Sequence, residues 1–248
     1  MAPFVYSIEG NIGTGKSTFL EKLKEHYKGD EDVCFLAEPT QVWDTIKDKN
    51  GVTILEKYYK DQVRYAFSFQ MMAFISRLTG LKDALNNDKY TIIIMERSLF
   101  TDCNVFAKML YDDKKIEEIE YTIYKKWYND FMKELPPISF IYLRTEPIIS
   151  LKRVKERNRE GETIPLEYLE NCHKYHDIWL LGHNTAPLLK IDANIDMHNN
   201  PEIIISWIKS TERFINHKKK AGTLSSIIDY VYYLQEIDYV YYLQEKLF

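Results

Sequence analysis

The fold of this chain is decided by the stretch Gly10-Asn11-Ile12-Gly13-Thr14-Gly15-Lys16-Ser17, which matches the phosphate-binding pattern G-x-x-x-x-G-K-[S/T]. It lies between the apolar run 4–8 and a helical pattern that begins at Lys16. The glycines let backbone N–H groups turn toward phosphate oxygens, and the start of the helix adds its positive dipole end. We expect residues Gly10 to Thr18 to hold the phosphates of a nucleoside triphosphate, with Lys16 neutralising the phosphoryl group in transfer and Ser17 binding Mg²⁺.

Short apolar runs recur along the chain and alternate with stretches of helical periodicity. The apolar runs are residues 4–8, 33–36, 91–95, 138–143 and 188–191. The helical stretches are residues 16–27, 54–85, 116–135, 147–158 and 166–181. Short runs that are apolar throughout are typical of parallel strands buried on both faces, and the helices between them cover the sheet. The sequence therefore predicts an α/β fold with a central parallel sheet of five strands.

The composition fits one globular domain that acts on a small molecule. The chain has 248 residues, 45% of them hydrophobic, and a formal net charge of −4. Without a basic excess it lacks the electrostatic footprint of a nucleic-acid binder. Cys34, Cys103 and Cys172 lie far apart in no metal-ligand spacing, which predicts reduced thiols. No apolar run reaches the roughly 18 residues of a membrane span and the N-terminus lacks a signal peptide, so we expect a cytoplasmic protein.

The C-terminal region contains a perfect tandem repeat. Residues 228–236 read Ile-Asp-Tyr-Val-Tyr-Tyr-Leu-Gln-Glu, and residues 237–245 repeat this segment without change. Two copies fall short of a solenoid. We expect residues 1–220 to form the catalytic domain and residues 221–248 to be an appendage without a role in the chemistry.

Two acidic motifs follow predicted strands. Glu38 precedes Pro39 shortly after residues 33–36, and Glu96-Arg97-Ser98 comes directly after residues 91–95. Open α/β sheets bind ligands at the carboxyl ends of their strands, so both motifs are expected beside the phosphate-binding loop. There Glu38 can accept the proton of an attacking hydroxyl, and the second motif can serve a metal ion and a phosphate. Taken alone, a loop-entry residue and a structural ion pair are the simpler explanations.

Taken together, the motifs resemble those of the deoxyribonucleoside kinases, the family of deoxycytidine, deoxyguanosine and mitochondrial thymidine kinases. The motifs that recur in the same order are the loop at 10–17, Glu38-Pro39 with Trp43, Phe67-Ser68-Phe69-Gln70, Glu96-Arg97-Ser98, and Arg153 to Arg159 followed by Ile164-Pro165-Leu166-Glu167-Tyr168-Leu169. The resemblance spans roughly residues 4–181. It implies a P-loop kinase fold with an arginine-rich lid and transfer of the γ-phosphate of ATP to the 5′-hydroxyl of a deoxyribonucleoside. It also implies a bound Mg²⁺ and a homodimer formed through the helix at 54–85 and a helix starting near Phe100.

The resemblance assigns roles to single residues. It implies that Glu38 is the general base for the 5′-hydroxyl, Glu96 the acid near the metal, and Arg97 the arginine that steadies the phosphoryl acceptor. Tyr59, with an acid of the lid, matches the pair that binds the sugar 3′-hydroxyl. Gln70 matches the glutamine that reads the base edge, where an amide offers a donor and an acceptor together. The aromatic residues that could line or stack on the base are Trp43, Phe67, Phe100 and Phe106.

Three arginines resemble the family's lid over the phosphates. Arg153, Arg157 and Arg159 would close on the γ-phosphate and stabilise the charge of the transfer state. An exposed charged helix face is the alternative for this segment. The lid is one residue shorter than the commonest pattern, which leaves the sugar-binding acid open between Glu160 and Glu162, with Glu162 preferred.

Arg77 and Asp102 bear on the choice of base. They match an arginine–aspartate pair of the deoxycytidine and deoxyguanosine kinases, at positions where thymidine-preferring members generally carry uncharged residues. A carboxylate held by an arginine can bind an amino-bearing base edge, whereas it crowds the thymine methyl. We therefore favour deoxycytidine, deoxyadenosine or deoxyguanosine, with a thymidine-preferring or broad-specificity enzyme as the alternative.

Two other functions use a similar loop. A nucleoside monophosphate kinase shares the P-loop and an arginine lid, but it needs a basic site for the acceptor's phosphate, and Glu38 argues against that. A nucleotide-dependent regulatory switch would carry a guanine-specifying Asn-Lys-x-Asp motif or an apolar-Asp Walker B motif. Asn184 and Asp192 lie in neither.

Overall fold

The computed structural model describes residues 2–158, 164–197 and 200–221. The chain divides into two compact units, Met1–Ile205 and Ser206–Phe248. The described part of the second unit is the portion of helix α10 (Pro201–Ala221) from Ser206 onward. Apart from Ala221, the expected appendage with its tandem repeat lies outside the described residues, and the domain boundary near residue 220 stays a prediction.

Five parallel strands form the central sheet in the order β2-β3-β1-β4-β5, which confirms the predicted architecture. The strands are β1 (Phe4–Glu9), β2 (Val33–Leu36), β3 (Ile92–Glu96), β4 (Ile138–Arg144) and β5 (Leu188–Asp192). In the register, Val5 of β1 lies opposite Ile93 of β3 and Ile138 of β4. From β1 the chain runs to β2 at one edge of the sheet, whereas from β3 it runs past β1 to β4 on the other side. This order opens a crevice beside the carboxyl ends of β1 and β3, where open α/β sheets bind ligands.

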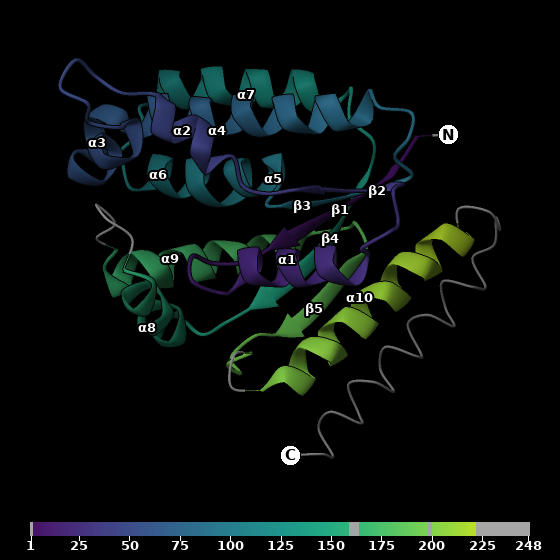
Figure 1. The fold of residues 1–248 in the computed structure, drawn as a ribbon. Coiled ribbons are helices and arrows are strands. Elements are labelled where there is room, and N and C mark those ends of the chain that lie inside the picture. The colour runs from purple at the N-terminus through teal and green to yellow at the C-terminus, as the bar shows by residue number, and fades with distance from the viewer. Residues whose placement is uncertain (1, 159–163, 198–199, 222–248) are drawn as a thin grey trace. The chain divides into compact units, whose positions relative to one another are not determined.

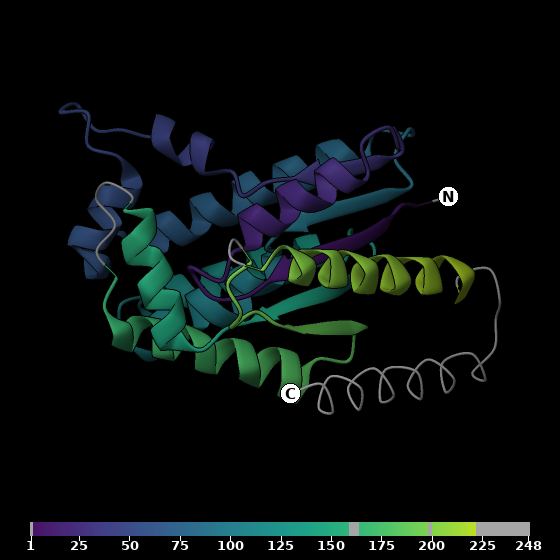
Figure 2. The same cartoon turned by 60° about the horizontal axis from the view of Figure 1, so that its bottom comes forward.

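Helices cover both faces of the sheet. The helices and π-helical stretches are α1 (Lys16–His26), α2 (Thr40–Thr45), α3 (Ile54–Lys60), α4 (Gln62–Leu85), α5 (Leu99–Thr101), η1 (Asp102–Ala107), α6 (Lys108–Asp112), α7 (Glu118–Met132), α8 (Pro147–Arg157), α9 (Leu166–Asp177), η2 (Ile178–His183) and α10. On one face, Val5, Ile93 and Phe140 pack in an apolar cluster with side chains of α4, η1 and η2. Helix α1 contacts β1 and β3, and these strands lie between α1 and α4 (Figures 1 and 2).

The prediction of one long helix over residues 54–85 is wrong, because the chain forms two helices separated at Asp61. The Asp61 carboxylate accepts a hydrogen bond from the backbone N–H of Arg64 at 3.2 Å and caps α4. Aspartate favours such a cap over a helix interior, since its side chain competes for backbone N–H groups. The break gives α3 its own direction, and its residues Tyr58 and Tyr59 line the cavity described below.

The helix expected to start near Phe100 is also interrupted. The chain passes from α5 through the π-helical stretch η1 into α6, and the helix predicted over residues 166–181 ends at Asp177 and continues as η2. A π-helical stretch widens the helix, and such stretches are frequent at functional sites. The first residue of η1 is Asp102, which faces the cavity.

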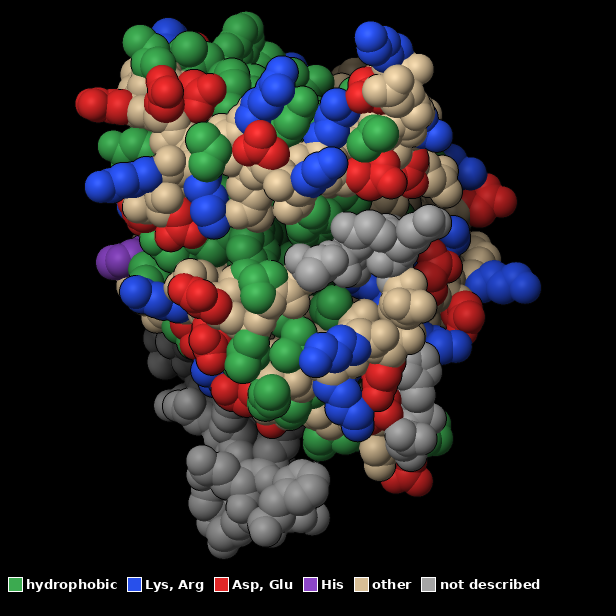
Figure 3. All heavy atoms as spheres, turned by 90° about the vertical axis from the view of Figure 1, so that its left-hand side faces the viewer, with side chains coloured by type: hydrophobic (Ala, Val, Ile, Leu, Met, Phe, Trp, Pro, Cys, Tyr) green, Lys and Arg blue, Asp and Glu red, His purple; other side chains and the backbone are tan. Residues whose placement is uncertain are grey.

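The cysteines, the helices and one face of the surface complete the description of the fold. Cys34, Cys103 and Cys172 are free thiols. No helix in the described part of the chain has the length and apolar character of a membrane span. The face toward which the strands point carries side chains of both charges interspersed (Figure 3).

Candidate active site

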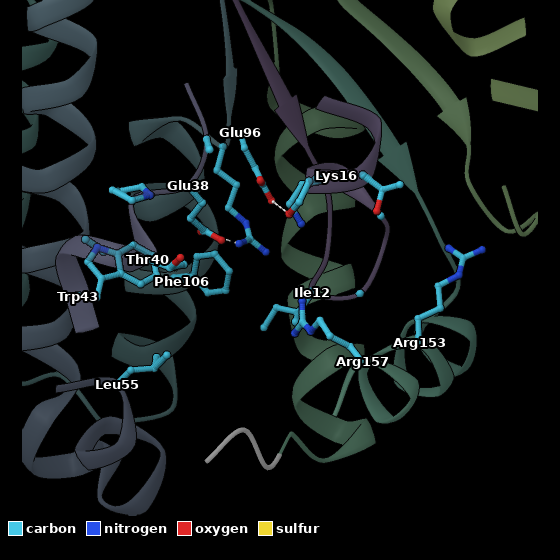
Figure 4. A pocket seen from close by; sticks show the side chains of 18 of the residues that line it. Ile12, Lys16, Glu38, Thr40, Trp43, Leu55, Glu96, Phe106, Arg153 and Arg157 are labelled. Carbon is cyan, nitrogen blue, oxygen red and sulfur yellow. Dashed lines mark hydrogen bonds and ion pairs between the residues drawn. The ribbon is translucent and has the colours of Figure 1, made fainter. Parts of the chain in front are cut away.

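A cavity of about 1180 Å³ lies at the carboxyl ends of the strands (Figure 4). It exceeds the roughly 300–1,000 Å³ typical of a pocket for one small ligand, so it has room for two substrates. Glu38, Trp43 and Phe106 lie on one side of it, and Arg153 and Arg157 lie on the other. The residues predicted from sequence that line it are Ile12, Gly13, Gly15, Lys16, Ser17, Thr18, Glu38, Trp43, Tyr59, Gln70, Arg77, Glu96, Arg97, Asp102, Phe106, Arg153 and Arg157.

The phosphate-binding loop is closely packed. Gly13 has φ +82°, and a Cβ atom there would lie 2.5 Å from the carbonyl oxygen of Ser150 on α8, so a larger residue cannot replace it without a shift of the backbone. The Asn11 side chain donates a hydrogen bond to Leu169 O at 2.8 Å and ties the loop to α9. The loop is therefore held between α8 and α9.

Lys16 is buried and lines the cavity. Its Nζ donates a hydrogen bond to Asn11 O at 2.7 Å. Burial, together with the nearby charge of Arg97, lowers the pKa of Lys16 to about 7. A cation held under these conditions gains much when an anion arrives, which suits the binding of a phosphate chain.

Ser17 and Glu96 form the candidate metal site. The Ser17 hydroxyl donates a hydrogen bond to Glu96 Oε1 at 2.9 Å. Both groups are hard oxygen ligands, which Mg²⁺ prefers. In the described part of the chain, no three side chains of His, Cys, Asp or Glu gather as a metal cluster. The donor set therefore fits an ion that takes one carboxylate and one hydroxyl from the protein and completes its shell with water and substrate phosphates.

The opposite half of the cavity contains a chain of buried ion pairs. Glu38 Oε1 accepts hydrogen bonds from Arg97 Nη1 at 2.7 Å and Arg77 Nη2 at 3.3 Å. Arg77 in turn donates from Nε and Nη2 to the two carboxylate oxygens of Asp102, at 3.0 and 3.1 Å. One arginine therefore bridges the carboxylate expected to act as base and the carboxylate expected to read the nucleobase.

These contacts set the charge states of the two carboxylates. Burial would raise the pKa of Glu38, but the positive charges of Arg97, Arg77 and Lys16 outweigh it and lower the pKa to about 2. For Asp102 burial is the larger effect and raises its pKa to about 6, although Arg77 opposes it. At neutral pH Glu38 is fully ionised and Asp102 predominantly so, and both can accept protons or hydrogen bonds.

Several polar atoms around the cavity are buried without a hydrogen-bond partner among the described residues. They are Gln70 Oε1, Arg77 Nη1, and Nε and Nη2 of Arg97. Buried polar groups in folded proteins are nearly always hydrogen-bonded, so unsatisfied groups that converge on a cavity indicate a polar ligand. Gln70, Arg77 and Arg97 all line the cavity, so these unsatisfied side chains lie beside the space that a bound polar ligand would occupy.

The sequence places this site in a known family. The model of the deoxynucleoside kinase family matches residues 6–216. The chain belongs to the deoxynucleoside kinase family. It is 35% identical to the deoxycytidine kinase of Homo sapiens over 234 residues, which covers 82% of this chain and 88% of that protein.

Two further relatives are of similar length. A probable deoxycytidine kinase of fowlpox virus is 38% identical over 213 residues, covering 82% of this chain and 85% of the viral protein. The mitochondrial deoxyguanosine kinase of Xenopus laevis is 30% identical over 222 residues, with 78% and 83% covered. These matches confirm the resemblance drawn from the motifs, the P-loop kinase fold, and the assignment as an enzyme that phosphorylates a nucleoside, with ATP as the phosphate donor that the family implies.

The lid arginines of this kinase are placed differently from one another. Arg153 donates hydrogen bonds to three backbone carbonyls after β5, those of Ala193, Asn194 and Ile195, at 2.8, 3.2 and 3.1 Å. These contacts tie Arg153 to the chain after β5. Arg153 also lines the cavity, and its role in binding phosphate stays a prediction. Arg157 lines the cavity one turn further along α8. Arg159, Glu160 and Glu162 lie outside the described residues.

Two aromatic residues expected at the base lie elsewhere. Phe67 packs in the apolar clusters between α4 and its neighbours, and Phe100 stacks on Trp179 with ring centroids 6.2 Å apart. Phe69 lines the cavity instead. Residues two apart on a helix point about 200° from each other, so Phe67 and Phe69 cannot both face the ligand.

Several residues besides Phe69 line the cavity although the sequence analysis did not predict them there. Tyr58 stacks on Phe69 with ring centroids 4.7 Å apart, and its hydroxyl lies 3.1 Å from that of Tyr168. Leu55 also lines the cavity. The sequence could have indicated Leu55, because it precedes Tyr59 by four residues and therefore lies on the same face of the helix. Tyr168 belonged to a motif already recognised, yet nothing in the sequence showed which element it would contact.

Proposed function

We propose that this kinase transfers the γ-phosphoryl group of Mg²⁺-bound ATP to the 5′-hydroxyl of a deoxyribonucleoside whose base carries an exocyclic amino group, namely deoxycytidine, deoxyadenosine or deoxyguanosine. The observation that supports this choice is the buried pair of Arg77 and Asp102 beside Gln70. An ionised carboxylate accepts a hydrogen bond from an amino group, whereas thymine offers a carbonyl oxygen and a methyl group at the corresponding edge. Asp102 therefore attracts the first kind of base and repels the second.

Glu38 is the proposed general base. As the 5′-oxygen bonds to the γ-phosphorus, its proton passes to the Glu38 carboxylate, and the bond to the bridging oxygen of ADP breaks. Its low pKa makes Glu38 a weak base. The transfer state of phosphoryl groups is loose and needs little activation of the nucleophile, so position matters more than basicity.

The positively charged groups of the site have separate proposed roles. Lys16 faces the transferring phosphoryl group, and Arg97 places the acceptor through its contact with Glu38 and its unpaired Nη2. Ser17 and Glu96 would hold Mg²⁺, which when bound neutralises charge on the phosphates. Arg157 would supply further positive charge from the lid.

We further propose a homodimer through α4 and α7, with α7 in place of the helix expected near Phe100. These helices run side by side in Figure 1. They expose Ile75 (51%), Ile119 (67%), Ile123 (42%) and Trp127 (48%). The three residues of α7 are four apart and so share one face of that helix, and large exposed apolar groups on one face are typical of an interface. Trp127→Glu should convert the protein from dimer to monomer in sedimentation equilibrium at micromolar concentration, and a monomeric wild type would contradict the proposal. The cytoplasmic location stays a prediction.

The decisive experiment measures kcat/KM for the four deoxyribonucleosides under equal conditions with labelled ATP and Mg²⁺. Parallel reactions contain a nucleoside monophosphate or no acceptor. The proposal expects product with one or more of the three amino-bearing nucleosides and slower reaction with thymidine. Preference for thymidine, or equal use of all four, would favour the thymidine-preferring or broad-specificity alternative. Faster reaction with the monophosphate would reject a nucleoside as the acceptor.

A further inference from the structure

Arg97 has a backbone conformation that is uncommon for a residue with a side chain. Its φ is 61°, in the left-handed region, where a Cβ atom is crowded. This turn ends β3 directly after Glu96, with Arg97 N donating to Ile8 O at 3.0 Å. It also directs the guanidinium group toward Glu38, over the ring of Phe106 at 5.2 Å. Strained conformations persist where the surrounding structure holds them in place.

The residues after Arg97 are held by Glu9, the last residue of β1. Glu9 is 0% exposed. Its Oε1 accepts hydrogen bonds from Ser98 N at 3.1 Å and Ser98 Oγ at 2.6 Å, and its Oε2 accepts one from Thr101 Oγ1. Ser7 Oγ donates a further hydrogen bond to Oε1 at 2.7 Å. A buried carboxylate is costly unless it is well satisfied, so these donors are strongly held.

The Ser98 hydroxyl binds Glu9 in place of capping the helix that Ser98 begins. Ser98 is the N-cap residue of α5, where a serine side chain usually accepts a hydrogen bond from its own helix. Here it makes no such bond, and its hydroxyl donates to Glu9. The tie to Glu9 therefore fixes the chain immediately after the left-handed residue.

We infer that Glu9 is a positioning residue for Arg97: by holding Ser98 and Thr101 it keeps Arg97 in its left-handed conformation, with the guanidinium group on Glu38 before substrates bind. The inference rests on the proposed role of Arg97 at the acceptor. Glu9 is fully buried and cannot touch a substrate, so it acts through the chain that it holds. A small displacement of a catalytic group can lower the rate by about 10²-fold while binding remains.

Three variants test this inference through kcat and the KM values for ATP and deoxycytidine. Glu9→Met keeps the length of the side chain and removes every acceptor, and it should lower kcat roughly 100-fold with the KM for ATP within about twofold. Glu9→Gln keeps an oxygen for Ser98 through weaker neutral hydrogen bonds, and it should recover kcat to within roughly 10-fold of wild type. The control Ser7→Ala removes a hydrogen bond to the same carboxylate within β1, and kcat should stay within about twofold.

A double-mutant cycle with Arg97→Ala separates positioning from general support of the fold. If Glu9 acts through Arg97, Glu9→Met should change kcat less than about threefold in the Arg97→Ala background. If the losses of kcat in Glu9→Met and Arg97→Ala multiply in the double variant, the two residues act independently and the inference is overturned. A KM for ATP that rises as much as kcat falls would also overturn it, since Glu9 would then support the phosphate-binding loop.

The proposed role of Arg97 is tested separately in the same cycle, because an Arg97→Ala enzyme with wild-type kcat would reject that role whatever Glu9 does. If thermal melting shows that Glu9→Met does not fold, two other variants decide by the same criteria. These are Glu9→Gln and the double variant Ser98→Ala with Thr101→Val, each measured with and without Arg97→Ala.

Discussion

Replacing Arg77 by Met together with Asp102 by Ala should raise kcat/KM for thymidine relative to deoxycytidine. The two side chains are 4% and 1% exposed and are joined by two hydrogen bonds, so Asp102 presents a fixed negative acceptor to the base. The double variant removes that acceptor and opens space for the 5-methyl group. Gln70 remains in place, and its amide can pair with the edge of thymine.

The magnitude follows from one contact with the base edge. Such a contact is worth about 1–3 kcal/mol, which is roughly a 5- to 150-fold change in the ratio of the two kcat/KM values. Each single variant should be less active than the double variant, because a buried charge left without its partner costs about 3–5 kcal/mol. Asp102→Ala should be the milder of the two, since Arg77 keeps its 3.3 Å contact with Glu38.

The assay compares initial rates for both nucleosides with each enzyme at pH 7. A matched control replaces Lys82 by Met and Glu134 by Ala, an exposed ion pair of 2.7 Å that also involves α4, and it should leave the ratio unchanged. The reasoning is refuted if the wild type already prefers thymidine, or if the double variant leaves the ratio as it was.

Three further predictions concern the base, the lid and acid stability. Glu38→Gln should lower kcat by roughly 10² or more while calorimetry still detects ATP binding, and wild-type turnover would remove Glu38 from the mechanism. Arg157→Ala should lower kcat, whereas Arg153→Ala should mainly raise the KM for ATP because it frees the backbone after β5; identical kinetic profiles would contradict this division. Burial lowers the pKa of His176 from 6.5 to about 3, so the native state binds fewer protons than the unfolded state and loses roughly 2 kcal/mol of stability between pH 7 and pH 5. Urea unfolding should show this loss in wild type and in the exposed control His183→Gln but not in His176→Gln.

The sheet could be predicted closely from sequence, because the three central strands β3, β1 and β4 are buried along nearly their whole length and all five strands are mainly apolar in sequence. The predicted strands differ from the observed ones by at most one residue at either end, as for Phe4–Glu9 against 4–8, and Val33–Leu36 matches its prediction. The break at Asp61 was not predictable from periodicity, since apolar spacing continues through it. The helix ends there because the Asp61 side chain caps α4. The free energy of such a cap is small, so apolar periodicity does not reveal it and only the structure shows it.

The part of the site that could not be predicted from sequence depends on contacts between residues distant in the chain. The motifs located Lys16, Glu38 and Arg97 because each follows a predicted strand, and parallel strands bring such residues to one edge. Arg153 is predicted to bind phosphate because its type and spacing fit that role. Its hydrogen bonds to carbonyls some forty residues away could not be predicted, because a charge pattern does not show which backbone segment the fold brings beside an arginine.

The distribution of charge gives the cavity two halves that suit two kinds of substrate. In the acceptor half, Glu38 and Asp102 are held by Arg77 and Arg97, so the charges compensate one another before a substrate arrives. A neutral nucleoside can enter there by exchanging hydrogen bonds, whereas an acceptor phosphate would meet the Glu38 carboxylate. In the donor half, burial lowers the pKa of Lys16, so a bound anion would stabilise its charged form. Monophosphate acceptors are thus disfavoured by the same arrangement that draws in the triphosphate, and this asymmetry is the physical reason for a nucleoside as the acceptor.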